Sequence, residues 1–147
     1  MFIKYGSLIA FGVAIIGMTY LVLHKSIITE NPISIIIQIC SFGLMIWARI
    51  IFGFRSFHAS ANTTNGKLIT NGPYKYFRHP IYAAVIYFFL SSLISFPYLE
   101  TLLAVLLIIG GLFARMLFEE KSLQITYPEY EFYAKKTKRI IPFYILP

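Results

Sequence analysis

Residues 5–23 read YGSLIAFGVAIIGMTYLVL and contain no acidic or basic side chain. A helix rises ~1.5 Å per residue, so this run would reach about 28 Å and cross the hydrocarbon core of a bilayer. A cleaved secretory signal is the alternative, but it has a shorter apolar region, and no small-residue cleavage site follows this run. We therefore expect residues 5–23 to form a membrane-spanning helix.

The whole chain shares this apolar character. Of its 147 residues, 58% are hydrophobic and 13% are charged, whereas soluble domains have about 45–50% apolar and about 25% charged residues. A soluble protein of this length would be unable to bury so much apolar surface, which excludes the soluble and disordered classes. Cys40 is the only cysteine, so the sequence indicates no disulfide scaffold and, with three scattered histidines, no metal site.

Three further apolar runs are expected to form helices in the membrane. Their ranges are residues 33–54, 81–96 and 99–118. The turn signal Asn31-Pro32 precedes the first of them, and Phe96-Pro97 separates the other two. The run that begins at Ile81 would reach only about 24 Å, so a re-entrant hairpin is an alternative to two separate spans. The expected fold is an all-α polytopic membrane protein with about four transmembrane helices, in a single domain over residues 1–147.

Small residues recur at helical spacing in the first and last of these spans. They are Gly6, Ala10 and Ala14 in the first, and Gly110, Gly111 and Ala114 in the last. Small side chains let two membrane helices approach closely. These positions are therefore candidates for a helix–helix contact, and incidental small residues facing lipid are the alternative for the first span.

The basic residues predict an orientation. Four spans put the amino terminus, a loop over residues 55–80 and a tail over residues 119–147 on one side of the membrane. The basic residues on that side are Lys4, Arg55, Lys67, Lys75, Arg78, Lys121, Lys135, Lys136, Lys138 and Arg139. The opposite loops contain only Lys25, so the positive-inside rule predicts that the richer side is cytoplasmic. That side also holds nearly every polar side chain, and the opposite loops are too small to build a site, so we expect any active site on the cytoplasmic side. Such loops and their contacts with anionic lipid also explain the net charge of +7, and no nucleic-acid partner is expected.

The loop over residues 55–80 contains several turn signals. Asn71-Gly72-Pro73 follows a short extended piece that ends at Thr70. Pro80 suits the first turn of the third span, because its missing N–H would have no partner there anyway. His79 would then lie at the start of a helix, where free amides and a partial positive charge accept anions.

The tail over residues 119–147 is expected to form an amphipathic helix. Thr126 and Glu129 have the spacing of a capping box that starts a new helix. Tyr130, Tyr133 and Thr137 would share one face of that helix. Its basic end makes attachment to an anionic lipid surface the alternative role for this helix.

Arg115 and Glu119 are four residues apart near the end of the last span and would share a helix face. An arginine inside an apolar span costs about 2.5–3.5 kcal/mol on insertion scales. A carboxylate partner or an anionic ligand would offset that cost. The pair is therefore either a structural ion pair at the membrane boundary or part of a site.

Several common site motifs do not occur in the sequence. It contains no dinucleotide-binding or phosphate-binding glycine loop, no H-E-x-x-H pair and no nucleophile elbow. The loop and the tail instead concentrate Tyr, His, Arg and Glu. These residue types suit a ligand that carries its own cation, carboxylate, hydroxyls and flat base.

Residues 68–82, LITNGPYKYFRHPIY, resemble the signature of integral-membrane methyltransferases of the isoprenylcysteine carboxyl methyltransferase type. The second half of the signature is Arg115-x-x-x-Glu119-Glu120, followed by Tyr130-x-x-Tyr133 and Arg139-x-x-Pro142. The wider family also resembles phospholipid N-methyltransferases and the carboxyl-terminal part of sterol reductases. The resemblance implies transfer of a methyl group from S-adenosylmethionine to a lipid, prenylated or otherwise amphiphilic acceptor in the bilayer.

The resemblance also implies a site in which the tail closes over the loop. The residues that it implies as cofactor contacts are Lys67, Leu68, Ile69, Tyr74, His79, Pro80, Ile81, Tyr82, Glu119 and Glu120. Arg115 and Glu119 are implied as the catalytic residues. The resemblance leaves open whether Glu119 and the adjacent Glu120 exchange roles. The alternatives are an NADPH-dependent reductase of the sterol type and a non-catalytic membrane module that binds lipid or protein.

Overall fold

The computed structural model describes residues 2–53 and 68–141, and these form an all-α protein, as expected. Its α-helices are α1 (Phe2–Leu23), α2 (Pro32–Phe52), α3 (Pro80–Leu90), α4 (Ser92–Ser95), α5 (Leu99–Thr126) and α6 (Tyr130–Lys136). A 3₁₀-helix, η2, covers Gly72–Lys75. Within the described residues the β-structure is limited to one isolated parallel bridge between Phe77 and Lys138.

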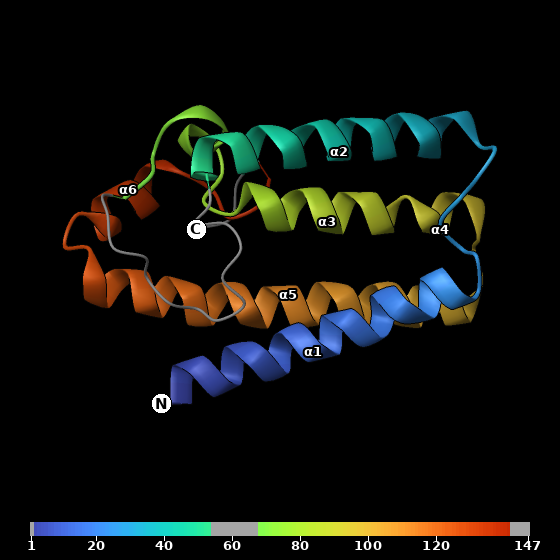
Figure 1. Cartoon of the computed structure of the whole chain (residues 1–147), viewed down its shortest axis with the longest axis horizontal. Coiled ribbons are helices and arrows are strands. Elements are labelled where there is room, and N and C mark those ends of the chain that lie inside the picture. Colours follow the sequence, from blue (N-terminus) through green and yellow to red (C-terminus); the bar gives the residue numbers. More distant parts are fainter. Residues whose placement is uncertain (1, 54–67, 142–147) are drawn as a thin grey trace.

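The long helices form two layers (Figure 1). Helix α1 packs along α5, and α2 packs along α3. The amino terminus, the end of α2, the start of α3 and helix α6 lie at one end of the molecule, which we call the site end (Figure 1). The α1–α2 and α4–α5 connections lie at the other end. The amino terminus, the described part of the loop and the tail therefore share one end, as expected.

The structure differs from the expected four full spans in one helix. Helices α1, α2 and α5 are long and apolar enough to cross a membrane, whereas the apolar segment Pro80–Ser95 is shorter. This segment divides at Ser91, whose hydroxyl donates to the carbonyl oxygen of Phe88 at 2.6 Å. The Ser34 hydroxyl at the start of α2 donates to the Ser91 carbonyl at 3.0 Å and lies 2.8 Å from the Ser95 hydroxyl. The short segment therefore reaches the end of the molecule opposite the site, and does not turn back midway as a re-entrant hairpin would.

Close contact between α1 and α5 depends on Gly111. A Cβ atom at this position would lie 2.5 Å from the carbonyl oxygen of Ala10 and 2.7 Å from the amide nitrogen of Ala14. Ala14 is fully buried, which confirms the helix–helix contact expected from the small residues. Gly110 does not take part, because it is exposed and a Cβ atom added there would have no neighbour within 4 Å.

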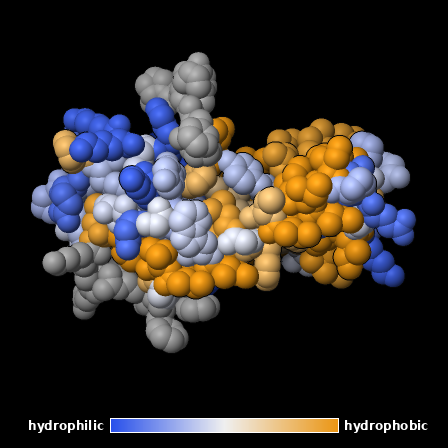
Figure 2. Space-filling view, turned by 90° about the horizontal axis from the view of Figure 1, so that it is seen from above, coloured by the Kyte–Doolittle hydropathy of each residue, from blue (hydrophilic) through white to orange (hydrophobic). Residues whose placement is uncertain are grey.

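The outer surface between the two ends of the molecule is largely hydrophobic. Figure 2 shows hydrophobic residues over much of that surface, hydrophilic residues gathered at the site end, and a smaller hydrophilic group at the opposite tip. On α2, the side chains of Ile36, Phe42 and Ile50 are all exposed. An apolar exterior of this extent is unfavourable in water and is typical of helices that face lipid.

Candidate active site at the junction of loop and tail

The turn after Ile69 strongly favours glycine at position 72. Gly72 has φ +58°, and a Cβ atom on it would lie 2.8 Å from Cγ1 of Ile51 at the end of α2. The turn leads into η2, where Tyr74 is buried with its ring 5.5 Å from that of Phe52. The expected turn is therefore confirmed, and it fixes Tyr74 against α2.

The tail pairs with the loop through backbone hydrogen bonds. The Arg78 amide donates to the Lys138 carbonyl at 2.7 Å, and the His79 amide donates to the Arg139 carbonyl at 3.0 Å. His79 occupies the N-cap position of α3 without a side-chain capping bond, and Pro80 occupies the first turn, as expected. This pairing brings residues 138–139 of the tail directly beside the segment that leads into α3.

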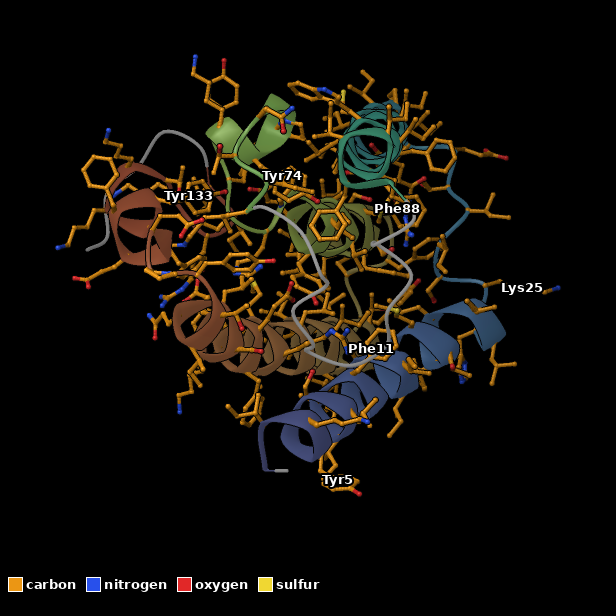
Figure 3. All side chains as sticks on the ribbon, turned by 60° about the vertical axis from the view of Figure 1, so that its left-hand side comes forward. Tyr5, Phe11, Lys25, Tyr74, Phe88 and Tyr133 are labelled. Carbon is orange, nitrogen blue, oxygen red and sulfur yellow. The ribbon has the colours of Figure 1, made fainter. Side chains whose placement is uncertain are left out.

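Tyr133 attaches α6 to the same loop. Its hydroxyl donates to the carbonyl oxygen of Tyr74 at 2.7 Å, and Figure 3 shows the two labelled residues on neighbouring segments. Burial raises the pKa of Tyr133 to about 12, so the hydroxyl keeps its proton and remains a donor. The predicted shared face is confirmed only for Tyr130 and Tyr133, whose ring centres lie 5.9 Å apart on α6. Thr137 follows the last residue of α6 in extended backbone, and its hydroxyl donates to the Tyr133 carbonyl at 2.8 Å.

The carboxylate of Glu120 joins the loop, the tail and α5. Arg78 Nε lies 3.2 Å from its Oε1, and His79 Nε2 lies 3.2 Å from the same oxygen. Arg139 donates to both carboxylate oxygens, with the shortest distance 2.9 Å from Nη2 to Oε2. Arg78 also donates through Nη1 to the carbonyl oxygens of Ala134 and Thr137, the latter at 3.1 Å. Glu120 is therefore occupied by three basic side chains.

The neighbouring acid, Glu119, belongs to a separate group. The Tyr82 hydroxyl donates to Glu119 Oε2 at 2.6 Å and accepts a hydrogen bond from Arg115 Nε at 2.7 Å. Arg115 is buried in α5, and its guanidinium lies 4.5 Å from the ring centre of Phe11 on α1. The phenol and the aromatic ring offset part of the cost of burying the arginine. Arg115 and Glu119, which are four residues apart on α5, are thus linked through Tyr82.

The expected capping box does not form. The Thr126 hydroxyl donates within α5 to the Ser122 carbonyl at 3.1 Å, and α6 begins at Tyr130 with Glu129 as an N-cap that makes no side-chain capping bond. The reason lies in Pro128, which restricts the preceding residue to extended backbone. Tyr127 accordingly has φ −119° and ψ 104° and ends α5 at Thr126.

Tyr130 has a buried hydroxyl that lacks a hydrogen-bond partner within the described part of the chain. The residue is 1% exposed, and an unpaired buried polar group of this kind costs about 1–3 kcal/mol. Burial raises the pKa of Tyr130, as do the nearby carboxylates of Glu120 and Glu119, whereas Arg78 lowers it. The hydroxyl is thus a neutral polar group whose ionisation burial and both carboxylates disfavour.

Most of the residues implied by the resemblance lie at the site end. Those in the two hydrogen-bonded groups are His79, Tyr82, Arg115, Glu119 and Glu120. Tyr74 and Pro80 are buried, whereas Leu68, Ile69 and Ile81 are half-buried. Lys67 lies outside the described residues.

Three residues at this end were missed as site components. Arg78 and Arg139 bond Glu120, and Phe11 packs on Arg115. The signal for the two arginines was available, because an acid near the membrane boundary needs cationic partners. Phe11 had no comparable signal, since one aromatic residue in an apolar span resembles any other.

The fold and the site define an integral membrane protein with a polar, hydrogen-bonded centre at one end of an apolar helix bundle. A family model of phospholipid methyltransferases matches residues 53–130, which is more than half of the chain. The chain belongs to this family of membrane methyltransferases, and the resemblance to the phospholipid and isoprenylcysteine methyltransferases is confirmed at that level. Comparisons with curated proteins and with solved structures gave no match. The described residues contain no group of three metal-ligating side chains.

Proposed function

We propose that the protein transfers a methyl group from S-adenosylmethionine to an amphiphilic acceptor held in the bilayer. The observation that carries this proposal is the group of Arg115, Tyr82 and Glu119, hydrogen-bonded in series at one end of an apolar bundle. Membership of the methyltransferase family supports the reaction class. The group offers a cation, a phenol and a carboxylate next to a lipid-facing exterior.

The side chains at the site end suit the proposed methyl donor. S-adenosylmethionine, when bound, supplies a methyl group on a sulfonium centre. The aromatic faces of Tyr74 and Tyr82 are able to stabilise such a cation. Glu119 has a carboxylate oxygen beyond the one bonded to Tyr82, which suits an ammonium group or ribose hydroxyls. Because Glu120 is occupied by Arg78, His79 and Arg139, we assign ligand binding to Glu119 and a structural role to Glu120.

Arg115 is the residue that we assign to the acceptor. A guanidinium binds a carboxylate through two parallel hydrogen bonds and keeps its charge at all relevant pH values. An acceptor with a carboxylate, as in an isoprenylcysteine, would be oriented in this way. Transfer of a methyl group needs mainly positioning and exclusion of water, and the tail residues bonded to the loop contribute to both. The basic residues on the site end favour its exposure to the cytoplasm.

Ligand-dependent thermal unfolding in detergent tests the choice of cofactor. S-adenosylhomocysteine is expected to raise the melting temperature, because a ligand at one hundred times its Kd adds about 2.7 kcal/mol to stability. NADPH at the same concentration is expected to leave the melting temperature unchanged. Stabilisation by NADPH alone would instead support the reductase alternative and contradict the proposal.

A further inference from the structure

The hydroxyl of Tyr130 is a buried polar group of the tail that no contact within the described residues explains. Tyr130 starts α6 and is 1% exposed, and its hydroxyl has no hydrogen-bond partner there. Two other tyrosine hydroxyls bond backbone carbonyls of the loop and tail: Tyr133 bonds the Tyr74 carbonyl, and Tyr87 bonds the Ile140 carbonyl. Burying a hydroxyl without a partner is unfavourable, so proteins rarely leave one in this state.

The neighbouring groups are already engaged with other residues. Both oxygens of Glu120 accept hydrogen bonds from Arg139, and Oε1 also lies 3.2 Å from Arg78 and from His79. The Arg78 guanidinium is likewise engaged with the Ala134 and Thr137 carbonyls. Tyr130 packs edge-on against Tyr133, with the ring centres 5.9 Å apart, and Tyr133 bonds the Tyr74 carbonyl of the loop. The carboxylates of Glu120 and Glu119 also raise the pKa of Tyr130, after burial.

We propose that the Tyr130 hydroxyl is a hydrogen-bonding contact for the bound methyl donor, and that this ligand supplies its missing partner. The inference rests on the proposed function and extends it to a residue of the tail. A phenol both donates and accepts one hydrogen bond. The matching ligand chemistry is a polar group that also suits Glu119, namely a ribose hydroxyl or the ammonium-bearing end of the donor.

The substitution Tyr130→Phe removes only the hydroxyl and gives two measurements that move in opposite directions. The melting temperature of the ligand-free protein is expected to stay equal or rise, because an unpaired buried hydroxyl is replaced by hydrogen. The affinity for S-adenosylhomocysteine is expected to fall about fivefold to tenfold, the effect of losing one hydrogen bond.

Two control variants separate this role from a structural one. Ser92→Ala removes another buried hydroxyl without a partner among the described residues, on α4 at the opposite end of the molecule, and is expected to leave ligand affinity unchanged. Tyr133→Phe removes a hydroxyl that bonds the Tyr74 carbonyl, and is expected to lower the melting temperature of the ligand-free protein. Tyr130→Phe is expected to differ from both controls: it lowers ligand affinity, unlike Ser92→Ala, and does not lower the ligand-free melting temperature, unlike Tyr133→Phe.

A second ligand identifies which part of the donor makes the contact. Methylthioadenosine retains the ribose but lacks the amino-acid part of S-adenosylhomocysteine. Weaker binding of both ligands to Tyr130→Phe would assign the contact to the ribose, and weaker binding of S-adenosylhomocysteine alone would assign it to the amino-acid end. Both results support the proposal.

The proposal is overturned if the unsubstituted protein binds S-adenosylhomocysteine and Tyr130→Phe binds it equally well. It is also overturned if Tyr130→Phe lowers the ligand-free melting temperature as much as Tyr133→Phe does, since the hydroxyl would then have a partner in the folded protein. Failure of the unsubstituted protein to bind S-adenosylhomocysteine would instead refute the proposed function, together with this extension of it.

Discussion

The Arg139 guanidinium donates to both oxygens of the Glu120 carboxylate, from Nε at 3.1 and 3.2 Å and from Nη2 at 2.9 Å. Arg139 belongs to the tail and Glu120 to α5, so this pair attaches the chain after α6 to the longest helix. Arg78 and His79 of the loop contact the same carboxylate, so the loop is attached to α5 as well. The adjacent acid, Glu119, bonds Tyr82, and the two acids therefore serve different groups.

Glu120→Gln is expected to destabilise the ligand-free protein by roughly 2–3 kcal/mol. Removing one member of a buried charge cluster leaves the other charges without compensation, and solvent moderates the loss because the Arg139 side chain is 39% exposed. Thermal unfolding in detergent measures the effect. Glu131→Gln is the control, since Glu131 forms an exposed pair with Lys135 that contributes little. Equal melting temperatures for the two variants would contradict the structural role of Glu120.

Glu119→Gln is expected to weaken binding of S-adenosylhomocysteine by about 1.5–3 kcal/mol, the scale of a hydrogen bond to a charged group. Stability should change little, because the amide oxygen of glutamine still accepts from the Tyr82 hydroxyl. Titration calorimetry in detergent measures the affinity. Unchanged affinity in Glu119→Gln, with a loss in a folded Glu120 variant, would reverse our assignment of the two acids.

Gly111→Ala is expected to destabilise the protein by about 1–3 kcal/mol, the usual effect of overpacking. The added Cβ would meet the backbone of Ala10 and Ala14, so α1 would have to move away from α5. Gly110→Ala is the matched control, because that position is exposed with nothing within 4 Å, and alanine favours the helix. A lower melting temperature for Gly110→Ala than for Gly111→Ala would contradict the observed packing.

Single cysteines at opposite ends test the proposed orientation. Lys75 and Glu30 are both exposed, at the site end and at the α1–α2 connection respectively. In a Cys40→Ser background, a membrane-impermeant thiol reagent added to intact cells should label Glu30→Cys and not Lys75→Cys, because basic loops are retained inside. Labelling of Lys75→Cys alone would reverse the orientation and remove access to a cytosolic cofactor.

The sequence predicted the long helices well and the contacts between segments poorly. Helices α1, α2 and α5 follow from uninterrupted apolar length, which depends on local composition alone. The bridge between Phe77 and Lys138 joins two backbones, and backbone pairing leaves no periodic signal in such short segments. The capping-box prediction was wrong because Thr126 is still part of α5 and is therefore not the N-cap of a new helix. Pro128 holds Tyr127 in extended backbone, and α6 begins only at Tyr130.

The division of roles between Glu119 and Glu120 was also beyond the reach of the sequence. Adjacent residues on a helix point about 100° apart, so they face different neighbours. Which acid meets Arg139 and which meets Tyr82 depends on where the tail and α3 pack against α5. That packing is a tertiary property, and no motif in the sequence specifies it.

Methyl transfer into lipid is the decisive measurement for the proposed reaction. Membranes containing the protein are incubated with S-adenosylmethionine that carries a labelled methyl group, and the label extracted with lipid is compared with that from Arg115→Ala. Arg115 is expected to orient the acceptor, so this variant should bind S-adenosylhomocysteine within a few-fold of the unsubstituted protein. We expect labelled lipid with the unsubstituted protein and loss of that label with Arg115→Ala. Equal label in the two membranes, with both proteins folded and present at equal amounts, would contradict the proposed reaction.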